Sequence, residues 1–287
     1  MSDPAAPLGL LEACWRDLVL GIVQGLTEFL PISSTAHLKV VPVILGWGDP
    51  GVSVTAAIQL GSIVAVIAYF RSDLSQVLRG ISRAFRNGQW REPEARLGFA
   101  MVVGTLPILL IGLGIKFAWA QGYEQSTLRS VPSIAIVSIV MALLLALAER
   151  VGARCKQLPG VSGRDGLLVG LAQALALIPG VSRSGSTLTA ALFDGWQRAD
   201  AARFSFLLGI PAITIVVLVE LKDALAASPG NGPLPLLVGI GSAAVVSWLA
   251  IDWLLKFLQR NSTWVFVAYR LLFGLLLLVW WGVHGAH

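Results

Sequence analysis

QGLTEFLPISSTAH, residues 24–37, begins as an apolar helix and then brings a carboxylate, a proline, three hydroxyls and a histidine close together. Proline lacks a backbone donor and clashes with the preceding turn, so the helix should break at Pro31. Ionisable groups such as Glu28 and His37 are costly in a membrane and usually face a protein interior or a wet cavity. The stretch therefore predicts a broken helix whose polar residues face an interior site.

The composition places this break inside a membrane protein. Hydrophobic residues make up 56% of the chain and charged residues 13%, with a mean hydropathy of +0.77, whereas globular domains carry about 25% charged residues. About 20 apolar residues span the hydrocarbon core. Six stretches of that length are expected to cross it: 52–70, 97–117, 131–149, 204–221, 234–255 and 263–283. We therefore expect one all-α polytopic domain over residues 1–287.

Charge distribution predicts the orientation. Arginines gather in 71–96, and basic residues exceed acids in 150–165, so by the positive-inside rule both loops should be cytoplasmic. The linker 222–233 is poor in charge and should lie outside, as should both termini. The net charge of +5 is then a topology signal and indicates no nucleic-acid partner. Cys14 and Cys155 fall in different compartments on this topology, which argues against a disulfide.

The chain also contains an internal repeat. PISST at 31–35 is echoed by PGVSRS at 179–184, and a Leu-Gly pair follows each proline at the same distance, at 60–61 and 208–209. The spans that hold these pairs should run in opposite directions, so we predict inverted repeats over 9–149 and 166–283. Each repeat would open with a re-entrant helix pair, at 9–50 and 166–200. Inverted repeats with broken helices place binding sites near the midplane, where the copies meet.

The residues after each proline predict a phosphate site. Free N–H groups and the positive dipole end make a helix N-terminus an anion site. Arg183 adds a fork of donors suited to phosphate oxygens, and Gly180 and Gly185 allow a close backbone approach. The predicted phosphate-binding residues are Ser33, Thr35, Ser182, Arg183, Ser184, Gly185 and Thr187. The alternative is that the hydroxyls only cap their helices.

A divalent cation site is predicted beside the phosphate. Glu28 follows Gln24 by one helical turn, so both lie on one face. Carboxylate and amide oxygens are hard ligands, appropriate to Mg²⁺ or Ca²⁺ that also contacts substrate phosphates. Alternatively, Glu28 pairs with Arg183 or Lys39 to neutralise charge.

His37 lies one turn after the first serines and is the main candidate for acid, base or nucleophilic chemistry. Gln59 precedes the first repeat glycine and is predicted to reach the site, and Ser205 occupies a nearby place in the other copy. Arg270 lies inside a predicted span and needs a partner within the bundle.

These two motifs, QGLTEFLPISSTAH and PGVSRSGST (179–187), resemble those of the undecaprenyl pyrophosphate phosphatase family, known also for bacitracin resistance. The likeness extends from about residue 10 to Tyr269. It implies a plasma-membrane enzyme that removes the terminal phosphate of a C55 polyprenyl diphosphate, recycling this carrier lipid for cell-wall synthesis. It also implies a divalent cation, a site open to the outer side of the membrane and a homodimer.

The resemblance also assigns roles to residues. Glu28 belongs to the acidic motif, and Ser34 and His37 are the two alternative nucleophiles. Arg183, with Ser182 and Thr187, binds the diphosphate. Gln24 stands where members often carry a second glutamate. Activation of water by His37 stays open as a third mechanism. The competing function is a flippase or transporter of a phosphorylated lipid, which would not need the acid–base group of His37.

Overall fold

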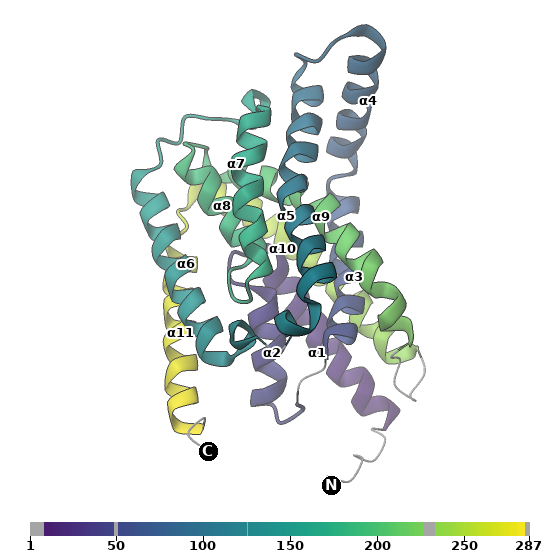
Figure 1. Cartoon of the computed structure of the whole chain (residues 1–287), viewed down its shortest axis with the longest axis vertical. Helices are drawn as coiled ribbons and strands as arrows, with labels where there is room; N and C mark the ends of the chain where they lie inside the picture. Colours follow the sequence, from purple (N-terminus) through teal and green to yellow (C-terminus); the bar gives the residue numbers. More distant parts are fainter. Residues whose placement is uncertain (1–8, 49–50, 125, 227–232, 285–287) are drawn as a thin grey trace.

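The computed structural model describes residues 9–48, 51–124, 126–226 and 233–284, which are helical apart from turns and one bridge between Lys156 and Trp196 (Figure 1). The helices are α1 (Leu10–Phe29), α2 (Ser34–Ile44), α3 (Gly51–Tyr69), α4 (Arg71–Asn87), α5 (Pro93–Glu124), η1 (Thr127–Arg129), α6 (Val131–Val151), η2 (Leu158–Gly160), α7 (Gly163–Ala174), η3 (Leu175–Leu177), α8 (Arg183–Phe193), α9 (Arg198–Ala226), α10 (Leu234–Arg260) and α11 (Trp264–His284).

Five helices in the described part of the chain are long and apolar enough to cross a membrane. They are Pro93–Ala118, Val131–Val151, Arg198–Leu218, Leu234–Arg260 and Trp264–His284, and each overlaps a predicted span. The sixth predicted span, 52–70, corresponds to α3, which is bent by 68° relative to α4. It counts as a span only when this bent pair is taken together. The prediction of an all-α, multi-pass membrane protein is confirmed, with five or six spans.

Both predicted helix breaks are present, and both have the same backbone conformation. Pro31 lies between α1 and α2, and Pro179 lies between η3 and α8. The residue before each second helix has a positive φ, which is 78° at Ser33 and 69° at Ser182, with ψ of 98° and 116°. Residues other than glycine rarely adopt such angles, and a surrounding structure must hold them there.

The two broken helices approach from opposite ends of the molecule. In Figure 1 the pair α1 and α2 occupies the lower half, and the pair α7 and α8 occupies the upper half. The helix α1 packs along α10, and α7 packs along α5. Glycines permit these contacts: a Cβ at Gly25 would lie 2.7 Å from Val246 Cβ, and one at Gly170 would lie 2.2 Å from the Gly104 carbonyl oxygen.

An apolar core lies beside the first break. Phe29, the last residue of α1, is fully buried and packs edge-to-face on Phe206 of α9, with ring centroids 5.3 Å apart. Phe206 also contacts Phe70 from the α3–α4 bend. These contacts hold the end of α1 against α9, which brings the polar residues beside Phe29 next to the second half of the chain.

Candidate active site

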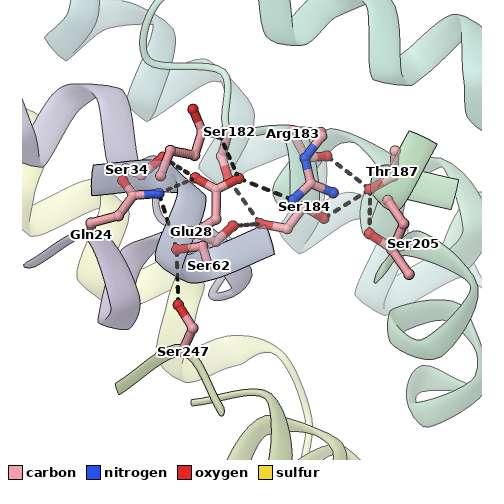
Figure 2. A network of polar contacts seen from close by, with 12 residues as sticks. Gln24, Glu28, Ser34, Ser62, Ser182, Arg183, Ser184, Thr187, Ser205 and Ser247 are labelled. Atoms are coloured by element: carbon pink, nitrogen blue, oxygen red, sulfur yellow. Dashed lines mark hydrogen bonds and ion pairs between the residues drawn. The ribbon is translucent and has the colours of Figure 1, made fainter. Parts of the chain in front are cut away.

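An ion pair joins the two halves of the chain where the broken helices meet. Glu28 lies in the last turn of α1, and Arg183 is the first residue of α8. Arg183 Nη2 lies 3.1 Å from Glu28 Oε1, and the two side chains are 10% and 6% exposed. Figure 2 shows this pair at the centre of a polar network. The second motif therefore meets the first directly.

Three further predicted residues converge on the Glu28 carboxylate. Oε2 accepts hydrogen bonds from Ser34 Oγ at 2.7 Å and from Gln24 Nε2 at 3.1 Å. Oε1 accepts one from Gln59 Nε2 at 3.5 Å. Lys39, the other predicted partner of Glu28, instead donates to the backbone carbonyl of Arg129.

The hydroxyls that follow Pro179 connect the breaks and cap α8. Ser184 Oγ lies 3.0 Å from the Leu30 carbonyl oxygen and 3.3 Å from that of Glu28, so it bridges to the end of α1 (Figure 2). Ser182 Oγ accepts from the backbone N–H of Gly185 at 3.1 Å, which is helix capping as the alternative predicted.

Thr187 and Ser205 form a buried pair beside these residues. Their hydroxyl oxygens lie 2.5 Å apart, and Thr187 also donates to backbone carbonyls within α8. Ser205 therefore lies directly beside a residue of the second motif, Thr187.

Arg183 keeps one donor free. Its Nη1 is buried and has no hydrogen-bond partner among the described residues. The guanidinium lies over Gly209, where a Cβ would come within 1.9 Å of Nη1. The second repeat glycine therefore makes room for the arginine. A buried unpaired donor is unfavourable, and an anionic oxygen would satisfy it.

His37 is buried close to the first break, but its ring faces α11. Nδ1 lies 2.7 Å from the Ser33 carbonyl oxygen, and Nε2 lies 2.6 Å from the Tyr269 hydroxyl. The ring stacks on Phe273 with centroids 4.3 Å apart. Both nitrogens are thus engaged away from Glu28. Of the other first-break residues, Ser33 is buried and Thr35 is exposed.

Comparison with known proteins identifies the family. Residues 17–276 match the family described as "Bacitracin resistance protein BacA". The chain belongs to the BacA family. It is 90% identical over 287 residues, the full length of both chains, to a Synechococcus sp. (strain CC9605) protein named undecaprenyl-diphosphatase. A relative with the same name in Parasynechococcus marenigrum (strain WH8102) is 82% identical over 287 residues, the full length of both chains. Another in Prochlorococcus marinus (strain MIT 9303) is 76% identical over 272 residues, which cover 95% of this chain and 92% of that one.

This BacA-family chain also has a buried serine pair behind Gln24 that the sequence motifs do not predict. Gln24 Nε2 lies 3.3 Å from Ser62 Oγ, and Ser247 Oγ donates to Ser62 Oγ at 2.9 Å (Figure 2). Both serines are fully buried. Ser62 lies one turn after Gln59 on α3, and residues spaced in this way share a helix face. Its helical spacing from Gln59 could have indicated that Ser62 lies near the site. No sequence pattern indicated Ser247, which lies on α10.

In this BacA-family chain, Arg270 makes more contacts at the two breaks than its sequence position indicated. Its Nη1 donates to the carbonyls of Pro31 and Val181 at 3.1 and 3.0 Å, and its Nη2 donates to that of Gly180 at 2.8 Å. Its Nε lies 3.3 Å from the Ser138 carbonyl oxygen. One guanidinium on α11 therefore holds the backbone of both breaks, and its hydrogen bonds described here all go to carbonyls.

Proposed function

We propose that this chain is an undecaprenyl-diphosphatase, which hydrolyses the terminal phosphate of undecaprenyl diphosphate to give undecaprenyl phosphate and inorganic phosphate. Relatives of this name are 90% and 82% identical over their full lengths. The observation in the structure that carries the proposal is the pairing of Arg183 with Glu28 at the meeting point of the two breaks, where one guanidinium nitrogen has no partner in the described part of the chain.

Arg183 and the start of α8 would bind the diphosphate. The free Nη1 can donate to a phosphate oxygen at once, and Nη2 can exchange its contact with Glu28 for a hydrogen bond to a second phosphate oxygen. Arginine presents donors in a fork that matches phosphate. Catalysis of phosphoryl transfer depends mainly on positioning and on stabilising charge in the transition state. Arg183 is placed to position the phosphate and to stabilise the charge of the transition state.

Glu28 and Gln24 would hold the divalent cation. The described residues contain no group of three His, Cys, Asp or Glu side chains that could bind a metal by themselves. One carboxylate and one amide oxygen still suit Mg²⁺, which commonly takes one or two carboxylates and completes its shell with water and phosphate oxygens; Ca²⁺ would need more oxygens from the substrate. When bound, such a cation would offset the charge of the diphosphate. Glu28 would then release Arg183 to the substrate.

Ser34 is the better placed of the two candidate nucleophiles. Its hydroxyl already donates to Glu28 at 2.7 Å, so the carboxylate can take its proton. Ser34 Oγ would form a bond to the terminal phosphorus while the bond from phosphorus to the bridging oxygen breaks, releasing undecaprenyl phosphate. Water would then hydrolyse the phosphoserine. His37 would take the proton of the water in this second step, or activate water in a direct hydrolysis.

We also infer that the chain is an inverted repeat, 9–149 and 166–283. The matched backbone at Ser33 and Ser182 supports this, as does the entry of the two broken pairs from opposite ends in Figure 1. On this arrangement the site opens to the outer side of the membrane, and both termini lie outside. A homodimer stays a prediction from the family.

Release of phosphate from undecaprenyl diphosphate in detergent tests the function. Micelles have no compartments, so a flippase or transporter would give no signal there. Arg183→Ala should lower release by at least about 100-fold, because a preorganised donor to the transition state commonly contributes that much. Arg203→Ala is the matched control, since this arginine is exposed and pairs with Asp73. Chelation of divalent cations should also stop the reaction. Normal turnover in Arg183→Ala would remove that residue from the site, and no release from the parent protein would favour transport.

A further inference from the structure

Tyr269 contacts the one histidine that the proposed chemistry uses. Its hydroxyl lies 2.6 Å from His37 Nε2, and the two rings are nearly parallel, with centroids 5.7 Å apart. Phe273 also stacks on His37, with ring centroids 4.3 Å apart. His37 is 6% exposed. The imidazole is therefore buried and packed closely against α11.

The hydrogen bonds define the tautomer of His37. The Ser33 carbonyl can only accept, so the proton of the neutral ring must be on Nδ1. Nε2 then carries the lone pair, and the Tyr269 hydroxyl must donate to it. Nε2 is consequently the only nitrogen of the neutral ring that can accept a proton from a reacting group.

The position of Tyr269 is itself fixed relative to both breaks. The next residue, Arg270, donates to the carbonyls of Pro31, Gly180 and Val181. Ser33, whose carbonyl binds Nδ1, is held at a φ of 78°. The helix α11 is thus tied to the same strained turn that presents His37, which places Tyr269 beside Nε2.

We propose that Tyr269 is a positioning residue that holds the orientation of His37 by donating to Nε2, the nitrogen that carries the lone pair. The proposal rests on the proposed function in that His37 serves a proton transfer at the phosphate site. The Ser33 carbonyl keeps the proton on Nδ1, and Tyr269 holds Nε2 in place. Without the Tyr269 hydroxyl, the ring would lose one of its two side-chain hydrogen bonds, and the direction of its Nε2 lone pair would no longer be fixed.

Nitrogen NMR of histidine tests the tautomer directly. The chain has three histidines, so replacing His284 and His287 with glutamine leaves His37 alone. At about pH 8 a histidine of ordinary pKa is neutral. We expect the ¹⁵N shifts of a protonated Nδ1 in this background, and a moved Nε2 shift after Tyr269→Phe, because the hydrogen bond to this nitrogen is lost. Tyr69→Phe is the matched control, because it removes a hydroxyl that bonds to Asp252 instead.

Kinetics supply the second readout. Tyr269→Phe should lower kcat about tenfold, the equivalent of one hydrogen bond, while KM stays within about twofold and the melting temperature matches that of Tyr69→Phe. Three results would overturn the proposal: a protonated Nε2 in the parent, an unchanged Nε2 shift in Tyr269→Phe, or a changed Nε2 shift with unchanged kcat. A parent that releases no phosphate would defeat the proposed function instead, because the NMR result does not depend on turnover.

Discussion

At the scale of single residues, the site is organised around one carboxylate. Glu28 accepts hydrogen bonds from side chains on α1, α2, α3 and α8. Only Arg183 among these donors carries a charge that balances the carboxylate. Glutamine at position 24 donates to Glu28, which a glutamate in its place could do only if protonated. In this chain, Gln24 therefore helps to satisfy Glu28 in the absence of a cation.

Replacing Gln24 with glutamate should change the dependence on divalent cations. Two carboxylates would face each other across a separation that is now 3.1 Å between Gln24 Nε2 and Glu28 Oε2, and like charges this close repel. We expect Gln24→Glu to lower the Mg²⁺ concentration for half-maximal phosphate release by about tenfold, since hard cations bind more tightly to sites with more charge. The same variant should melt at a lower temperature in chelator.

Gln76→Glu is the control for this prediction, because Gln76 lies on the exposed surface of α4 and bonds to Ser72. It adds the same charge away from Glu28. A Mg²⁺ dependence that is equal in Gln24→Glu and in the parent would contradict a role for position 24 in cation binding.

At the scale of helices, the breaks are held by contacts from outside each helix pair. Ser184 crosses from α8 to the carbonyls at the end of α1, and Arg270 reaches both turns from α11. Backbone carbonyls at a helix break lack their usual partners, and in an apolar surrounding they must find others. The strained turns at Ser33 and Ser182 persist because these neighbours satisfy the surrounding carbonyls.

Arg270→Lys should therefore loosen both turns. An ammonium keeps the charge but lacks the planar fork that reaches several carbonyls together. We expect the variant to lose about 3 kcal/mol or more of stability, given about 1.5–3 kcal/mol for each hydrogen bond to a charged group. The measurement is thermal unfolding in detergent, accompanied by phosphate release, which should fall as well.

Arg260→Lys serves as the control for Arg270→Lys, because Arg260 lies exposed in the last turn of α10. Its melting temperature should match that of the parent. If Arg270→Lys were as stable and as active as Arg260→Lys, the carbonyl contacts of Arg270 would have no part in holding the turns.

At the scale of the whole molecule, the surface of the helix bundle is apolar where lipid would contact it. Leu110 of α5 is 68% exposed and Val279 of α11 is 65% exposed, a pattern that would be unfavourable in water. In Figure 1 the beginning of α1 and the end of α11 lie at one end, and the α4 hairpin projects from the other. The arginines of α4 therefore project from the end opposite to the beginning of α1.

Cysteine labelling tests which end faces the cytoplasm. Cys155 is exposed in the basic loop that the positive-inside rule places inside. A Cys14→Ser variant should react with a membrane-impermeant maleimide only after the cells are permeabilised. A second variant, Cys14→Ser with Cys155→Ser and Leu234→Cys, carries its thiol at the half-exposed start of α10 and should react in intact cells. The reverse pattern would invert the proposed topology.

The sequence by itself determined the membrane class, the positions of the spans and the two helix breaks, because hydropathy and proline act over short stretches of chain. It also indicated that Gln24, Glu28 and Ser34 belong together, since helical spacing and one turn connect them. The link to Arg183 could be anticipated only through the resemblance between the two proline motifs.

The tertiary structure alone decided what surrounds these residues. Tyr269 lies 232 residues from His37 along the chain, and Arg270 lies 239 residues from Pro31. No local pattern encodes such pairs, because each depends on how α11 packs against the two breaks. The orientation of His37 toward α11, and the free guanidinium nitrogen over Gly209, likewise follow from packing between helices that are distant in sequence.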